Sequence, residues 1–479
     1  MDRDGLPREG LEGGTILLGE SIQKSGLLNM IANLILQYKP GKGVEICNPI
    51  RGGHNVLYRL KYEDGTSACM RVPCEVSARF PEEKVGYEVA MMRYVAANTT
   101  IPVPKVYHHG TAAENPSGTG PFIIMDYVDH EKDMSDILND PTLETGDLQI
   151  IDPNIAEEKL EKLYEQMANI LLQLSRLSFS RIGSLIQDAD GSFSLSGRPL
   201  TQYMNVLAGW MCSDFVPLSL GPYSTDKEWY CALADMHLMQ LNHQRNGGII
   251  DEDDARDKYV ARHLFRELAY DGWLTLELVE EGSEPTFYIY SGDLRPTNVL
   301  IDKDFCVTGV IDWEFAHAAP KAFSSDPPWW LLLRKPEDWP GGYEAWMNAY
   351  QPRLELFLRV LENEESKLWG NSTTGSMPAS SDTPLSQRMR KSWENRTWMI
   401  NYAARNGCVF DHLYWKYLDS RFFGSSEKKG HRARLSLFTK KEIEAMEYFV
   451  KGKMKENVGW KYIDWDALNV PAQLDDSGL

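Results

Sequence analysis

Hydrophobic residues change their spacing along the chain, and this change predicts two regions of different secondary structure. The stretch 17–38 carries leucine and isoleucine at helical spacing and stops at a Lys-Pro-Gly sequence. Residues 43–73 read as three short strands joined by tight turns at 51–55 and 63–65. We therefore expect an N-terminal helical extension over residues 1–42, followed by a small antiparallel sheet.

A helix is predicted next, beginning at Pro81, because proline is favoured at the first position of a helix. One face of this helix is apolar and carries Val85, Val89, Met92 and Val95. The apolar stretch 120–128 then predicts a strand that closes the sheet and passes into a hinge. Residues 43–128 are therefore expected to form a small N-terminal lobe.

From about residue 155 onward the pattern is mostly helical. The stretches 155–177 and 252–270 are amphipathic, and a capping box at 439–442 precedes a final long helix. Residues 370–386 are rich in Ser, Thr, Gly and Pro, which predicts a mobile surface loop. The expected fold class is α+β, with a larger, mainly helical C-terminal lobe over residues 129–479.

Composition narrows the class of protein. The 479 residues include 50 Lys and Arg against 69 Asp and Glu, and the resulting charge of −19 argues against a nucleic-acid binder. No run reaches the ~18 uncharged apolar residues of a membrane span, and the start of the chain does not resemble a secretory signal. Seven scattered cysteines without a C-x-x-C pair fit a reducing compartment. We therefore expect a cytoplasmic protein with neither a nucleic-acid nor a membrane partner.

Residues 290–314 hold the pattern with the most chemical content. Asp293 is followed five residues later by Asn298, and Asp312 comes fourteen residues after Asn298. Phosphoryl transfer needs a carboxylate that accepts the proton of the attacking hydroxyl, and oxygen ligands for Mg²⁺. A strand, a turn and a second strand between Asn298 and Asp312 would bring both side chains to one end of a hairpin. We interpret Asp293 as the base and the other two as metal ligands; a polar loop beside an ordinary hairpin is the alternative.

Arg295 lies two residues after Asp293. A cation at this position would neutralise negative charge that develops on the transferred phosphoryl group. We therefore include Arg295 as a catalytic candidate, with a plain surface arginine as the equal alternative.

The sequences Ser-Gly-Asp-Leu-Arg-Pro-Thr-Asn-Val-Leu-Ile-Asp, at 291–302, and Val-Ile-Asp-Trp-Glu, at 310–314, form a motif pair. This pair resembles that of the aminoglycoside phosphotransferase and choline kinase family, above all its fungal aminoglycoside phosphotransferase-like members. The resemblance runs from about residue 43 to 350. It implies a protein-kinase-like bilobal fold that binds ATP and Mg²⁺ between its lobes and phosphorylates a hydroxyl of a small molecule.

The resemblance also implies roles for single residues. Asp293 takes the position of the catalytic base, and Asn298 and Asp312 take the metal positions. The chain positions that correspond to nucleotide contacts are Gly52, Gly53 and Asn55 over the phosphates, Arg71 with its helix partner Glu88, and Met125, Tyr127 and Val128 in the hinge. Asp326 matches a carboxylate that usually holds the catalytic loop.

Two departures from the family pattern support a second hypothesis. The family commonly has His before the Gly-Asp, where this chain has Ser291, and Arg71 stands in place of a lysine. Arg and Lys are not interchangeable at a crowded phosphate site. The alternative is a pseudokinase-like protein that binds a nucleotide or another ligand without turnover. A protein kinase is disfavoured, because Asp312 lies in Ile-Asp-Trp-Glu and not in Asp-Phe-Gly.

The phosphate acceptor and the oligomeric state remain open from the sequence. The acidic balance slightly favours a cationic acceptor. Trp313, Trp329 and Trp330 lie near the motifs in sequence. They would form an apolar wall for the acceptor, or pack in the core as most tryptophans do.

Overall fold

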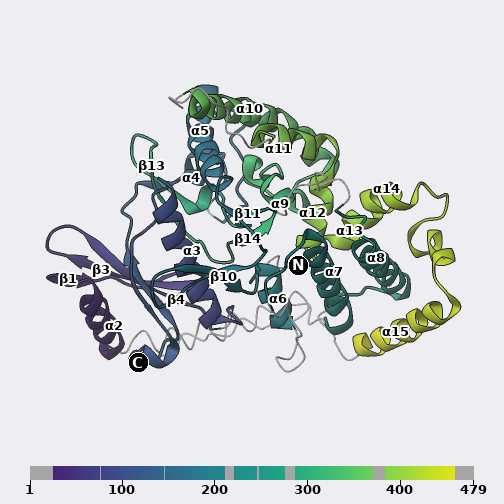
Figure 1. Cartoon of the computed structure of the whole chain (residues 1–479), viewed down its shortest axis with the longest axis horizontal. Helices are drawn as coiled ribbons and strands as arrows, with labels where there is room; N and C mark the ends of the chain where they lie inside the picture. The colour runs from purple at the N-terminus through teal and green to yellow at the C-terminus, as the bar shows by residue number, and fades with distance from the viewer. Residues whose placement is uncertain are drawn as a thin grey trace, which may run out of the picture.

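A computed structural model describes most of the chain. The described residues are 25–75, 77–144, 146–210, 221–244, 248–275, 286–370 and 383–458. They fold into two lobes, a sheet with its helices at the left of Figure 1 and a larger helical part at the top and right. The predicted bilobal α+β fold is confirmed. None of the described helices combines the length and apolarity of a membrane-crossing segment.

The N-lobe contains a six-stranded antiparallel sheet. Its strands are β1 (Gly43–Ile46), β2 (Ile50–Arg51), β3 (Asn55–Tyr62), β4 (Ser67–Pro73), β5 (Val106–Gly110) and β6 (Phe122–Asp126). They follow the order β1-β3-β4-β6-β5, and β2 pairs with β3. The predicted turn at 63–65 joins β3 to β4, and Gly65 adopts a φ of +84° there, which glycine tolerates without strain. The predicted antiparallel meander is therefore present.

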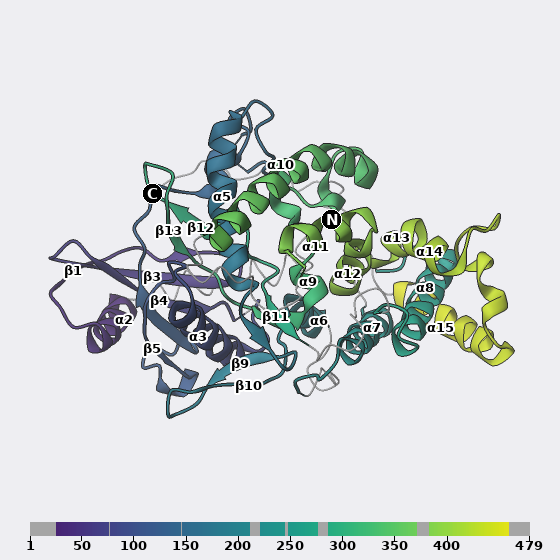
Figure 2. The same ribbon diagram turned by 45° about the horizontal axis from the view of Figure 1, so that its top comes forward.

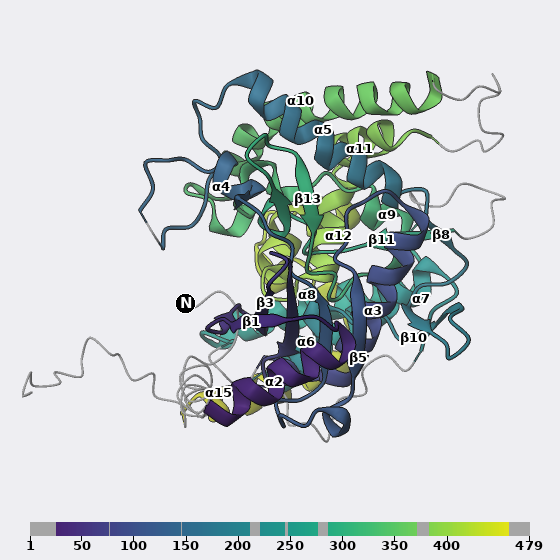
Figure 3. The same cartoon turned by 90° about the vertical axis from the view of Figure 1, so that its left-hand side faces the viewer.

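Two helices cover the two faces of this sheet (Figure 3). Helix α2 (Ser25–Tyr38) packs on the face that carries Met70 and Ile124, while α3 (Pro81–Asn98) packs on the face that carries Cys69 and Ile123. Side chains alternate along a strand, so Arg71 of β4 shares the α3 face with Cys69. Residues 17–24 of the predicted first helix lie outside the described residues.

Helices form most of the C-lobe. They are α4 (Met134–Leu138), α5 (Glu157–Leu174), α6 (Gln202–Trp210), α7 (Asp226–His243), α8 (Glu252–Tyr270), α9 (Lys321–Ser324), α10 (Gly342–Gly370), α11 (Leu385–Glu394), α12 (Thr397–Arg405), α13 (Phe410–Leu413), α14 (Asp419–Phe423) and α15 (Lys440–Val458). Helix α10 lies along α5, and α8 packs between α7 and α15 (Figure 2). The capping box predicted at 439–442 begins α15, where the Thr439 amide donates to Glu442 at 2.7 Å.

Short strands interrupt the helical lobe. They are β7 (Lys132–Asp133), β8 (Ser178–Phe179), β9 (Ser184–Gln187), β10 (Phe193–Gly197), β11 (Phe287–Tyr290), β12 (Val299–Ile301), β13 (Val307–Val310) and β14 (His317–Pro320). The β9–β10 hairpin, which the sequence pattern did not predict, packs on α3 of the N-lobe. Arg93 donates to Gln187 at 2.6 Å, and Arg198 pairs with Glu83 at 2.7 Å. A Cβ at Gly197 would lie 2.8 Å from the Tyr87 ring, so this close approach requires glycine.

The loop predicted at 370–386 is only partly within the described residues. Gly370 ends α10, and residues 371–382 lie outside the description. Leu385 and Ser386 already belong to α11, where Glu365 accepts hydrogen bonds from the Ser386 amide at 3.0 Å and hydroxyl at 2.6 Å. The predicted loop was therefore wrong at 385–386, because a buried carboxylate satisfies the first turn of this helix.

A buried histidine predicts how stability depends on pH. His237 of α7 has no exposed surface, and its Nε2 lies 3.0 Å from the Ala404 carbonyl oxygen. Burial, aided by the nearby Arg262 charge, lowers the pKa of His237 to about 3. An unfolded histidine has a pKa of about 6.5. The stability that depends on a neutral His237 is therefore present above a pH of about 6.5 and is lost as the pH falls towards 3.

We expect His237 to account for a loss of about 2 kcal/mol in the free energy of unfolding between pH 7 and pH 5. Urea unfolding at both pH values measures this loss. A His237→Gln variant has no group to titrate here, so its stability should fall by correspondingly less. Equal losses in wild type and variant would contradict the assignment.

Candidate functional site

A cavity of about 530 Å³ lies between the two lobes. Its volume falls within the range typical of small-molecule sites, about 300–1,000 Å³. With one exception, every candidate site residue from the sequence lines it: Gly52, Gly53, Asn55, Arg71, Glu88, Met125, Tyr127, Val128, Asp293, Arg295 and Asp312. The exception is Asn298, which lies directly behind Asp293. The fold thus gathers residues from both lobes around one cleft.

Asp293 is held by its own loop. After β11, a 3₁₀ turn over Pro296–Asn298 folds Asn298 back, so that its side-chain nitrogen donates to the Asp293 carbonyl at 2.8 Å and carboxylate at 2.9 Å. The Arg295 guanidinium lies 2.9 Å from the other carboxylate oxygen. Burial raises the pKa of Asp293, against the opposing effect of Arg295. A positioned carboxylate with a raised pKa suits a general base.

The hairpin predicted between the two metal candidates is present. β12 and β13 pair in antiparallel register, and the Ile311 amide donates to the Asn298 carbonyl at 2.9 Å. Asn298 and Asp312 therefore lie at the same end of the hairpin. Asp312 has a φ of +64°, a strained conformation for a residue other than glycine that is often found at functional sites.

These two residues offer the oxygen ligands that Mg²⁺ prefers. The Asn298 side chain donates both of its hydrogen bonds to Asp293 through its nitrogen, and its side-chain oxygen has no hydrogen-bond partner within the described part of the chain. One carboxylate oxygen of Asp312 accepts a hydrogen bond from Arg71, which leaves the second oxygen available as a metal ligand. The donor set therefore fits a divalent cation between Asn298 and Asp312.

Arg71 connects three carboxylates at the back of the cleft. Its guanidinium donates to Glu88 of α3 and to Asp312, and lies 3.1 Å from Glu314. The predicted pairing of Arg71 with Glu88 is therefore present. A lysine has one compact ammonium group, whereas the planar fork of arginine reaches several partners at once. Arginine at this position thus keeps the strand, the helix and the metal carboxylate connected.

Lys84 is a second buried cation, which the sequence analysis missed. It is 2% exposed, lies 2.5 Å from Glu314, and donates to the Asn55 side-chain oxygen at 2.6 Å. The Asn55 side-chain nitrogen also donates to Glu314, at 2.9 Å. Lys84 precedes Glu88 by four residues, and this spacing places both on one helix face. That spacing was the available sequence signal.

The charged groups of this network shift one another's pKa values. Burial alone would raise the pKa of Glu314, but the Lys84 and Arg71 charges outweigh burial and lower it to about 2. Burial lowers the pKa of Lys84, and Glu314 opposes that effect. Glu314 is therefore held as a carboxylate between two cations, next to the proposed metal ligands.

The hinge end of the cleft has apolar walls and one backbone donor without a partner among the described residues. Leu57 and Cys69 line it from the N-lobe, and Leu300 and Ile311 line it from the C-lobe. No hydrogen-bond acceptor for the Val128 amide is found in the described residues. A flat heterocycle would therefore find apolar walls and a backbone donor here, as predicted for the adenine of a nucleotide.

The phosphate end of the cleft contains the turn between β2 and β3. The Gly52 amide donates to the Asn55 carbonyl at 2.8 Å. A Cβ added at Gly53 would meet no atom within 4 Å, so the turn leaves open space beside its backbone. This position agrees with the predicted loop over the phosphates.

Asp326 does not hold the catalytic loop directly, in contrast to the expectation from the family pattern. Its carboxylate accepts hydrogen bonds from Ser392 at 3.1 Å and Asn401 at 2.7 Å, and pairs with Arg405 at 2.9 Å. The Arg405 guanidinium in turn lies 4.7 Å from the centre of the Tyr290 ring. Asp326 is therefore linked to the catalytic loop through Arg405, a residue of α12 that is distant from that loop in sequence.

Comparison with known proteins places this site in context. The family model of the phosphotransferase enzyme family matches residues 46–355. The protein "Altered inheritance of mitochondria protein 9, mitochondrial" of Candida glabrata is 24% identical over 323 residues, which is 58% of this chain and 49% of that protein. Its namesake in Zygosaccharomyces rouxii is 25% identical over 363 residues, 65% of this chain and 55% of that protein. The chain thus spans about half the length of these relatives.

A solved macrolide 2'-phosphotransferase type I is similar at 12% identity with a TM-score of 0.38, covering 82% of this chain and 96% of that one. This likeness is too distant to carry an argument about the site. The yeast relatives do correct one prediction. They are named as mitochondrial proteins, so the cytoplasmic location expected from the sequence was wrong. That expectation rested on the absence of a recognisable secretory signal and on the scattered cysteines, which were interpreted as a sign of a reducing compartment.

Proposed function

Since the chain belongs to the phosphotransferase enzyme family, we propose that it transfers the γ-phosphoryl group of ATP to a hydroxyl of a small molecule. One observation carries this proposal. Asp293 and Asp312 line the C-lobe side of the interlobe cleft, with Asn298 bonded to Asp293. The Arg71 cation of the N-lobe contacts Asp312, and the Lys84 cation lies beside it at Glu314. A base, a metal site and phosphate-directed cations are the parts that phosphoryl transfer requires.

In the proposed reaction, Asp293 accepts the proton of the attacking hydroxyl. The hydroxyl oxygen bonds to the γ-phosphorus as the bond to the bridging oxygen breaks, and ADP leaves. Asn298 keeps the Asp293 carboxylate oriented through its side-chain amide. Asn298 and Asp312 would hold Mg²⁺, which supplies charge neutralisation for the β- and γ-phosphates when bound.

In this proposal, Arg71 and Lys84 position the phosphates through different contacts. Arg71 fixes Glu88 and Asp312, so it sets the position of a metal ligand. Lys84 touches Asn55 at the end of the glycine turn and is therefore the buried cation beside the loop over the phosphates. We assign phosphate positioning to both residues. The charge network that Arg71 retains supports an active enzyme over the impaired, pseudokinase-like alternative.

Stabilisation by ATP and transfer of its phosphoryl group together separate these two hypotheses, because an impaired protein that still binds ATP transfers no label. A ligand at a hundred times its Kd stabilises a protein by about 2.7 kcal/mol. We expect ATP with Mg²⁺ to raise the Tm of the chain, and ATP with EDTA to raise it less. A screen of a metabolite extract with radiolabelled ATP then identifies the acceptor. No shift with ATP and any divalent metal, and no transfer of label, would support the impaired alternative.

The names of the yeast relatives also support a mitochondrial location as part of this proposal. Fractionation of cells that express the full-length natural protein tests it. Recovery outside the mitochondrial fraction would count against this part and would leave the proposed reaction untouched.

A further inference from the structure

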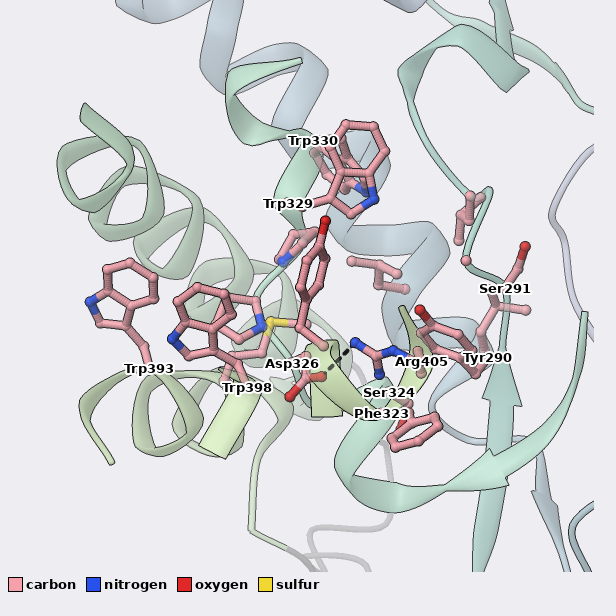
Figure 4. Close-up of a pocket in the computed structure, with 18 of the residues that line it drawn as sticks. Tyr290, Ser291, Phe323, Ser324, Asp326, Trp329, Trp330, Trp393, Trp398 and Arg405 are labelled. Carbon is pink, nitrogen blue, oxygen red and sulfur yellow. Dashed lines mark hydrogen bonds and ion pairs between the residues drawn. The ribbon is translucent and has the colours of Figure 1, made fainter. Parts of the chain in front are cut away.

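A second cavity, of about 100 Å³, lies on the other side of the catalytic loop, inside the C-lobe. Five tryptophans line it, and we call it the tryptophan pocket: Trp329, Trp330, Trp346, Trp393 and Trp398. Figure 4 shows Trp393 and Trp398 on one side, and Tyr290 and Arg405 of the opposite wall. A cavity of about 150 Å³ binds benzene in another protein, so this smaller one limits the bound group to the size of a branched alkyl group or, at most, a single small ring.

The pocket offers no free negative charge. Asp326 and Arg405 are its charged lining residues, and they pair with each other at 2.9 Å. Asp326 also accepts hydrogen bonds from two neighbouring side chains of the C-lobe. A cationic ligand would therefore have to compete with an ion pair that is already satisfied, and leaving a buried charge without its partner is costly.

Cations of the protein already lie over three aromatic rings of the pocket. The Arg405 guanidinium lies 4.7 Å from the Tyr290 ring centre and 4.4 Å from that of Phe323. The Lys335 ammonium lies 5.5 Å from the ring centre of Trp329. A second cation on these rings would be repelled. The pocket therefore suits an uncharged group.

Two buried donors lack a partner. Nη1 of Arg405 and Nε1 of Trp398 are buried and make no hydrogen bond to any described residue. An unsatisfied buried donor costs about 1–3 kcal/mol. A ligand oxygen that accepts a hydrogen bond would relieve this cost, so the fitting ligand is apolar with at least one ether, carbonyl or hydroxyl oxygen.

The pocket adjoins the interlobe cleft. Gly292 and Trp329 line both cavities, and Gly292 directly precedes the proposed base Asp293. A Cβ at Gly292 would meet only the Tyr290 side chain, at 3.6 Å or more. The small residue therefore leaves space where the two cavities meet.

We propose that the phosphate acceptor is an uncharged alcohol, which places an apolar or aromatic group in the tryptophan pocket and presents its hydroxyl at Asp293. This inference rests on the proposed function and names its class of substrate. It departs from the cationic acceptor that the acidic composition favours, because the local charges of the pocket are already paired.

Saturation-transfer NMR with two small alcohols tests the proposal on the whole chain. The probes are 2-phenylethanol, which is uncharged and aromatic, and choline, which is cationic. We expect a signal transfer to 2-phenylethanol and none to choline. Ser175→Leu adds apolar volume at a partly exposed residue that lines the pocket, and it should weaken 2-phenylethanol binding by about tenfold or more.

Two further variants keep the experiment decisive. Trp329→Ala removes a partly exposed ring that lines the pocket, and it should also weaken 2-phenylethanol binding. This variant tests the proposal by itself if Ser175→Leu does not fold. Trp273→Ala is the matched control, since Trp273 is 55% exposed and lies outside the pocket lining, and its binding should equal that of the wild type.

The outcomes separate this inference from the proposed function. Binding of choline without binding of 2-phenylethanol overturns the inference, and so does unchanged 2-phenylethanol binding in both pocket variants. The Tm response to ATP with Mg²⁺ is measured on the same samples. If that response is absent, the proposed function fails. The proposal that an uncharged alcohol is the phosphate acceptor then fails too, even if 2-phenylethanol binds.

Discussion

We expect Asp293→Asn to lower the rate of the proposed phosphoryl transfer by roughly 10²- to 10⁴-fold, the usual contribution of a positioned general base. An amide cannot take the proton of the attacking hydroxyl. The amide oxygen can still accept the hydrogen bond from Asn298, which is 2.9 Å from the carboxylate in the wild type. The lost ion pair to Arg295 is partly exposed and contributes little to stability. We therefore expect an unchanged fold and unchanged ATP binding.

Initial rates with the acceptor from the metabolite screen, the Tm and an ATP titration measure these three properties. Asp304→Asn is the matched control, because Asp304 is an exposed carboxylate in the β12–β13 turn of the same region. The control should retain the full rate. Full turnover by Asp293→Asn would refute the assigned base, whereas a lower Tm would mean that Asp293 acts mainly on the fold.

Arg71→Met should destabilise the protein by about 3–5 kcal/mol, the usual cost of leaving a buried charge without its partner. Glu88 is buried and would lose the guanidinium that it contacts, and Asp312 and Glu314 would lose the same cation. Because Asp312 is a proposed metal ligand, the response of the Tm to ATP with Mg²⁺ should disappear as well.

A double variant distinguishes charge imbalance from lost packing. Arg71→Met with Glu88→Leu removes the stranded carboxylate, so it should be more stable than Arg71→Met alone. Arg359→Met is the control for removing a surface ion pair. Arg359 is 56% exposed and pairs with Glu157 and Glu161, so its loss should cost no more than about 1 kcal/mol. Equal urea midpoints for Arg71→Met and Arg359→Met would contradict the buried network.

The part of the site that could be predicted is local in sequence. Asp293, Asn298 and Asp312 lie within one loop and one hairpin, so their spacing alone was enough to place them together. The periodicity of α3 and of the N-lobe strands was equally local. These elements form where short-range hydrogen bonds and an apolar face agree with each other.

The parts that could not be predicted depend on contacts between distant segments. Asn55 and Glu314 are 259 residues apart, and nothing near either one signals their hydrogen bond. The spacing of Lys84 places it on the helix face of Glu88, but its burial depends on contacts with Asn55 and Glu314 that only the folded lobes provide. The tryptophan pocket is assembled from α5 and from the consecutive helices α10, α11 and α12, and α5 lies far from the other three in sequence.

The β9–β10 hairpin has a consequence for how the two lobes move. It belongs to the C-lobe, yet it grips α3 through the Arg93–Gln187 and Arg198–Glu83 contacts. Helix α3 also carries Glu88, which lines the cleft, and Lys84, which contacts the cleft residues Asn55 and Glu314. These contacts link the sheet to the C-lobe through α3. We therefore expect that, when the cleft opens, α3 stays against the hairpin and the sheet turns relative to it.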